Sequence, residues 1–148
     1  MNTKRLLVTF LAVFVVVFFY DWGFHGYILR DAYIQSASLW RPETEMMRYF
    51  GWLVLGQLLL SVMFCLIYAN RYTEPGGVGP GIGYGLMAAL LLSAPTLITY
   101  AVQPMPLNII GAWFIGETIK LMIAGAILGA IYRPKLPLVS PAGQPVPA

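Results

Sequence analysis

The chain has 148 residues, of which 59% are hydrophobic and only 10% are charged, and its formal net charge is +3. Soluble domains carry about 25% charged residues, so a water-soluble domain is excluded, because one this small could not bury so much apolar surface. The basic residues are scattered, which argues against nucleic-acid binding. The single cysteine, Cys65, permits neither an internal disulfide nor a CxxC pair.

The first predicted helix covers about residues 4–22. Its apolar run, LLVTFLAVFVVVFFY, follows Lys4 and Arg5 as in a signal peptide, but the run is too long and no A-x-A-like cleavage site follows. We therefore expect a retained membrane anchor. The polar segment 23–48 comes next, and its part YILRDAYIQSASLW (27–40) is either a short interfacial helix or a continuation of the first helix.

Three more apolar helices are predicted after this segment, at about residues 43–70, 82–102 and 107–132. The turn EPGGVGPGIG, which starts at Glu74, separates the first two of them, because its glycines and prolines should not continue a helix. The link QPMP between the last two is so short that they should form an antiparallel hairpin. Pro95 predicts a kink in the third helix.

These elements predict an all-α fold, an integral membrane bundle of four transmembrane helices in a single domain (1–132) with a polar loop facing outward after the first helix. The tail 133–148 is proline-rich, and we expect it to be disordered. Positive charge is greater on one side of the membrane, with Lys4, Arg5, Arg71, Arg133 and Lys135 against Arg30, Arg41 and Arg48. By the positive-inside rule, both termini and the tail are predicted to be cytoplasmic.

Two charged residues in the last helix form the first candidate site. Glu117 lies about 15 Å from the start of this helix, at 1.5 Å per residue, and therefore close to the bilayer midplane. A charge at that depth costs about 2.5–3.5 kcal/mol. Glu117 and Lys120 are three residues apart and could pair, either as an ion-handling site or as a structural ion pair that fixes the helix. Gln57 and Ser61, one turn apart in the second helix, are the predicted polar partners.

A second candidate site is a polar cluster at the outer end of the first helix, formed by Asp21, His25 and Arg30. A carboxylate four residues before a histidine can orient it for proton transfer or metal binding. The chain has one histidine, so neither a zinc site nor any cofactor is predicted. Haem ligation by His25 stays open as an alternative to an interfacial hydrogen-bonding role. The methionines on the same side of the membrane are Met46, Met47 and Met105.

Small residues recur at four-residue steps in the last two helices. They are Gly81, Gly85, Ala89 and Ser93 in one helix, and Gly125 and Gly129 in the other. Such spacing lets helix backbones approach closely and predicts tight packing. The sequence leaves open whether this packing is within the chain or between chains.

The stretches HGYILRDAYIQSASLWRP (25–42) and LITYAVQPMPLNIIGAWFIGETIKLMIAGAILGAIYRP (97–134) resemble a group of small bacterial four-helix inner-membrane proteins, which are catalogued as domain-of-unknown-function proteins. The resemblance covers most of the chain outside the tail. It implies a bacterial inner-membrane location and a four-helix arrangement, and it implies no activity.

No nucleophile elbow, HExxH motif or phosphate-binding loop is present in the sequence, so we do not expect an enzyme. The leading hypothesis is a structural or accessory subunit that packs in the bilayer against other membrane proteins or itself. An alternative is an oligomeric small channel or a proton- or ion-coupled transporter that uses Glu117 and Lys120. A further alternative is an accessory to an electron-transfer complex, with His25 near a cofactor.

Overall fold

The computed structural model describes residues 2–71 and 76–132, and this part of the chain is helical and contains no strand. Four of its helices are long and apolar enough to cross a membrane: Thr3–Ile28, Glu43–Arg71, Val78–Val102 and Leu107–Ile131. The predicted class, an all-α integral membrane bundle with four spans, is confirmed. The predicted tail lies outside the described residues.

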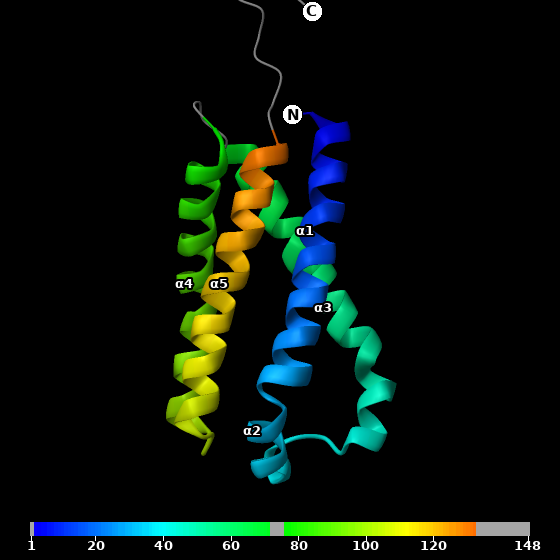
Figure 1. The fold of residues 1–148 in the computed structure, drawn as a ribbon, viewed down its shortest axis with the longest axis vertical. Coiled ribbons are helices and arrows are strands. Elements are labelled where there is room, and N and C mark those ends of the chain that lie inside the picture. Colours follow the sequence, from blue (N-terminus) through cyan, green and yellow to red (C-terminus); the bar gives the residue numbers. More distant parts are fainter. Residues whose placement is uncertain (1, 72–75, 133–148) are drawn as a thin grey trace, which may run out of the picture.

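The elements follow one another as α1 (Thr3–Gly23), η1 (Phe24–Ile28), α2 (Arg30–Gln35), η2 (Ala37–Leu39), α3 (Glu43–Arg71), α4 (Val78–Val102) and α5 (Leu107–Ile131). Figure 1 shows the beginning of α1 and the end of α5 at the same end of the bundle, while α2 lies at the opposite end. The four long helices therefore run alternately up and down. The short segment with α2 and η2 connects α1 to α3.

The first span is longer than predicted, because α1 does not end near residue 22. It continues as the π-helical segment η1, in which the Leu29 amide donates to the Phe24 carbonyl at 3.0 Å. Gly23 and Gly26 do not break it, since a broken helix in lipid would leave backbone groups without partners. Both alternatives for this region are partly realised: η1 continues the first helix, and α2 is a separate short helix.

The third span, α4, begins at Val78 rather than at the predicted residue 82. Gly79, Pro80 and Gly81 therefore lie in its first turn. Pro80 is tolerated there because the first amides of a helix have no intrahelical acceptor, so the missing N–H costs nothing. Gly77 precedes the helix with φ 141°, a conformation that L side chains rarely adopt.

The two last helices, α4 and α5, form the most extensive contact of the fold. A Cβ added to Gly81 would meet the Gly125 carbonyl oxygen, and one added to Gly125 would meet that of Gly81. A Cβ on Gly85 would likewise meet the Leu121 carbonyl oxygen. The predicted small-residue stripes thus pack on each other within one chain, with backbone against backbone.

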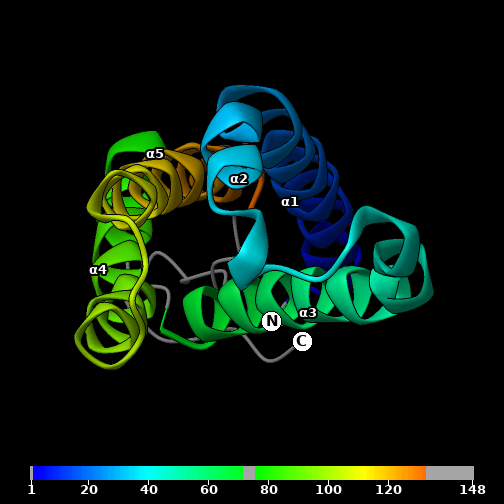
Figure 2. The ribbon, with the colours of Figure 1, turned by 90° about the horizontal axis from the view of Figure 1, so that it is seen from below.

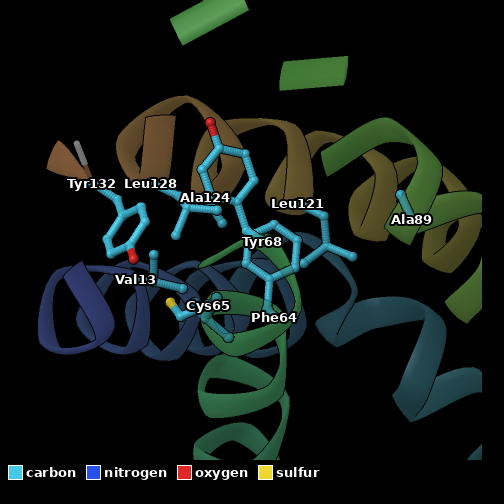
Figure 3. Close-up of a cluster of buried hydrophobic side chains, with 10 residues drawn as sticks. Val13, Phe64, Cys65, Tyr68, Ala89, Leu121, Ala124, Leu128 and Tyr132 are labelled. Atoms are coloured by element: carbon cyan, nitrogen blue, oxygen red, sulfur yellow. The ribbon is translucent and has the colours of Figure 1, made fainter. Parts of the chain in front are cut away.

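The main apolar core joins α1, α3 and α5 toward the end where the N-terminus lies. Figure 3 shows Val13, Phe64, Tyr68, Leu128 and Tyr132 converging there, and all five are buried. Only the second half of α3 takes part, because its buried residues begin at Gln57. Figures 1 and 2 show α3 crossing the bundle at an angle, with its N-terminal half away from α4 and α5.

Candidate functional site

A buried lysine is held between two carboxylates inside the membrane-spanning part of the fold. The Lys120 Nζ lies 3.0 Å from Asp21 Oδ1 and 2.7 Å from Glu117 Oε2. Asp21 and Lys120 are 99 residues apart in the sequence. The lysine side chain is only 6% exposed, whereas the Glu117 side chain is 25% exposed. The ion pair predicted within α5 therefore exists, and α1 adds a second carboxylate to it.

Helix α3 is tied to the same group through Gln57. Its Nε2 donates a hydrogen bond to Asp21 Oδ2 at 2.9 Å. We call Asp21, Gln57, Glu117 and Lys120 the ion network. It connects α1, α3 and α5, which share few other polar contacts in the described residues.

The predicted partners of Glu117 and Lys120 need correction. Gln57 binds Asp21 rather than either of these residues. Ser61 is fully buried, and its hydroxyl has no hydrogen-bond partner within residues 2–71 and 76–132. Ser61 lies one helical turn beyond Gln57 on the same buried face of α3.

The ion network carries a formal charge of −1 when its three ionisable groups are charged. It lies between two apolar clusters along the helices. Val13 and Val17 precede Asp21 in α1, and Leu121 follows Lys120 in α5. Ile109 and Ile110 belong to a second cluster, near the start of α5. Charges in such surroundings interact strongly, and removal of one partner leaves the others without compensation.

A cleft of about 240 Å³ opens beside the ion network. It is lined by Asp21, Phe24 and His25 of the first span, Leu92 and Thr96 of α4, and Trp113, Gly116 and Glu117 of α5. Both acidic residues of the ion network are among the lining residues, whereas Lys120 is not. The volume is below the roughly 300–1,000 Å³ of drug-sized ligand sites, so only a small ligand would fit.

Gly116 shapes this cleft, because a Cβ on it would meet the ring of Phe24. The Phe24 ring also stacks on Tyr20, with ring centroids 5.7 Å apart and an interplanar angle of 17°. The η1 segment can therefore lie directly against the backbone of α5. This close approach brings lining residues of the first span, Asp21, Phe24 and His25, beside those of α5.

Three aromatic side chains form a hydrogen-bonded group at the α2 end of the cleft. The Trp113 Nε1 donates to the Tyr33 hydroxyl at 2.7 Å, and the same hydroxyl is hydrogen-bonded to His25 Nδ1. Burial raises the pKa of the Tyr33 phenol above its ordinary value of 10.0. Tyr33 thus joins α2 to both the first span and α5.

The predicted outer-end cluster is divided in the structure. Asp21 and His25 line the same cleft, but Asp21 binds Lys120 whereas His25 binds Tyr33. Arg30 is exposed at the start of α2 and lies outside the cleft lining. Asp21 does not lie at a helix end, because the first span continues to Ile28.

The structure brings none of the candidate methionines to His25 in the cleft. Met105 is buried with Ile109 and Ile110, and Met46 and Met47 are exposed at the start of α3. In the described part of the chain, no three His, Cys, Asp or Glu residues are grouped so that they could hold a metal ion.

Comparisons with protein-family models, with curated proteins and with solved structures gave no match to this chain. The fold and the ion network together define a small multi-pass membrane protein with a charged site within its spans. Sequence reasoning missed the contribution of Asp21 to this site, although a lone carboxylate at the end of an apolar run was a signal. Phe24, Thr96 and Trp113 gave no signal, because such residues are common in membrane helices.

Proposed function

We propose that this protein moves protons or small cations across the membrane and that the ion network is where the ion is handled. The observation that carries this proposal is a single buried lysine held between carboxylates of two different spans, beside an open cleft. Ionisable residues within membrane spans mark ion and proton pathways by default.

Energetics support an ion-handling role over a purely structural one. A buried ion pair seldom stabilises a fold more than well-packed apolar residues of similar volume, because desolvation offsets the attraction. The α4–α5 contact shows that this chain joins helices through small residues without any charge. The charges of the ion network are therefore explained better by a role in ion handling than by a role in holding the helices together.

The geometry also provides a way for the network to respond to an ion. Glu117 is the more exposed of the two carboxylates and faces the cleft. When a proton or cation binds the Glu117 carboxylate, the Lys120 ammonium keeps a full partner in Asp21. Neutralising Glu117 therefore leaves a one-to-one ion pair between Lys120 and Asp21, and Lys120 is not left unpaired.

We also propose a membrane location and an oligomeric assembly for this protein. We place the protein in a bacterial inner membrane, with both termini in the cytoplasm. Four helices from one chain leave little room for a continuous pore, so we propose that several copies assemble and complete the path along their contacts.

The test is ion flux in liposomes that contain the purified protein, with protons followed by an internal pH-sensitive dye under an imposed membrane potential. We expect flux above that of empty liposomes and at least a tenfold loss in Glu117→Gln, as for a lost charge-assisted interaction of about 1.5–3 kcal/mol. The matched control is Glu43→Gln, which removes an exposed carboxylate at the start of α3. Flux equal to empty liposomes across protons, Na⁺ and K⁺, or equal flux in both variants, would sink the proposal.

A second candidate is an accessory subunit that packs against another membrane protein. The specific observation is that no residue of 43–56, the first half of α3, is buried, and this half leans away from α4 and α5. Native mass spectrometry of gently extracted protein decides between the two. Other subunits in fixed ratio would support the accessory role, whereas a homo-oligomer alone would contradict it.

A further inference from the structure

We infer that the cleft beside the ion network binds a small organic cation of the alkylammonium class. This inference rests on the proposed function and names the cation. Three properties of the cleft lead to it: the charge of its walls, the aromatic rings among them, and its size and shape.

Two of the three ionisable residues that line the cleft are acidic. Asp21 and Glu117 both line it, whereas Lys120 is not among the lining residues and its side chain is almost fully buried. His25 is the remaining ionisable lining residue, and its Nδ1 is occupied by the Tyr33 hydroxyl. The ion network beside the cleft keeps a formal charge of −1 after Lys120 is counted, which favours a cation.

The aromatic rings favour an organic cation over a metal ion. Phe24 and Trp113 line the same cleft as the carboxylates, and the bond from Trp113 Nε1 to Tyr33 holds the indole in place. Aromatic faces bind alkylammonium groups by cation–π attraction. A hard metal ion such as Ca²⁺ instead takes six or more oxygen ligands. The side chains that line this cleft supply oxygen only from two carboxylates and the Thr96 hydroxyl.

The size of the cleft restricts the ligand. About 240 Å³ is room for a compact cation such as choline, and it is too small for a drug-sized molecule. Its shape depends on Gly116, because any side chain there would push the Phe24 ring away from α5. A methyl group at residue 116 should therefore change the aromatic wall without changing any charge.

The test is calorimetric titration of the full chain in lipid nanodiscs with choline, with its uncharged isostere 3,3-dimethylbutan-1-ol, and with NaCl. We expect choline to bind at least about tenfold more tightly than the isostere, as for a charge-assisted contact. Trp113→Leu should weaken choline binding by about 2- to 30-fold, which corresponds to one cation–π contact. Trp52→Leu is the control, because Trp52 is 72% exposed on α3.

A second pair of variants keeps the test valid if Trp113→Leu fails to fold. Gly116→Ala should weaken choline binding by at least about threefold, whereas Gly111→Ala in the same helix should leave it unchanged, since a Cβ at residue 111 has nothing within 4 Å. No choline binding, equal binding of the isostere, or equal effects of the two alanines would overturn the inference.

Flux measured in liposomes that contain the same purified variants separates this inference from the proposed function. Proton flux that is lost in Glu117→Gln, without choline binding, would remove the organic-cation site and leave the ion pathway. Choline binding that depends on Trp113, without any flux, would leave a binding site and remove the transport proposal.

Discussion

Helix α5 is joined to its two neighbours by opposite means. Toward α4 it uses glycines, so that backbone carbonyls of each helix lie where a side chain of the other would be. Toward α1 it uses charge, with the Lys120 Nζ 3.0 Å from Asp21 Oδ1. One contact depends on the absence of side chains, and the other depends on two ionisable groups 99 residues apart.

If the proposed function is correct, the difference predicts which half of the bundle stays fixed and which half responds to ions. Backbone-to-backbone packing has no titratable part, so pH and ions should leave α4–α5 unchanged. The α1–α5 contact includes ionisable groups, so we expect it to change when a carboxylate of the ion network is protonated or binds a cation. The cleft lies where these two contacts meet, with lining residues from α1, α4 and α5.

The largest expected effect comes from breaking the fixed contact. Gly125→Leu would place a side chain against the Gly81 carbonyl, and we expect a loss of about 3 kcal/mol or more in the free energy of unfolding. Gly83→Leu is the matched control, since a Cβ on Gly83 has nothing within 4 Å. Unfolding in detergent, followed by circular dichroism, measures both. Equal stability of the two variants would show that α4 and α5 do not pack through this face.

An effect of similar size is expected from breaking the charged contact. Lys120→Met leaves Asp21 and Glu117 without their shared cation, and we expect a loss of about 3–5 kcal/mol in the free energy of unfolding. The triple variant Asp21→Asn, Glu117→Gln, Lys120→Met should regain most of this stability, because it contains no unpaired charge. If the triple variant is as unstable as Lys120→Met, the network is a structural requirement. Recovered stability without recovered ion flux would support the functional role.

The spans and the close packing were predictable because both follow from local patterns. Apolar runs long enough to cross a bilayer defined the four helices. The four-residue steps of Gly81, Gly85 and Ala89 identified the face of α4 that is buried, and the structure adds that its partner is α5. The start of α4 was placed too late, because Pro80 was treated as a helix breaker although proline is tolerated in a first turn.

The ion network was only half predictable. Glu117 and Lys120 are neighbours on one helix, so spacing alone paired them. Asp21 was assigned to the outer end because the first helix was expected to stop at residue 22, and its pairing depends on how far α1 continues and how it is rotated toward α5. Both properties belong to the tertiary structure and cannot be derived from the spacing of residues along one helix. The same holds for Gln57, whose partner is set by the angle at which α3 crosses α1.

The smallest expected effect concerns the aromatic group of His25, Tyr33 and Trp113, which joins α2 to the first span and to α5. Trp113→Phe keeps an aromatic ring at this position but removes the 2.7 Å hydrogen bond to the Tyr33 hydroxyl. We therefore expect a loss of about 1 kcal/mol in the free energy of unfolding. Hydrogen exchange of the amides in 30–40 should increase, since α2 is held through Tyr33. Trp52→Phe, at an exposed indole, is the control.

The same group should respond to alkaline pH in a defined direction. Burial raises the pKa of the Tyr33 phenol above 10.0, so the folded state keeps this proton at pH values where the unfolded state loses it. The stability contributed by Tyr33 is therefore complete below pH 10 and declines as the pH rises through the folded-state pKa. Exchange of α2 amides in Tyr33→Phe, compared with the unchanged chain on either side of pH 10, measures this. If exchange in the unchanged chain rises no faster above pH 10 than in Tyr33→Phe, Tyr33 is not what holds α2 against the cleft.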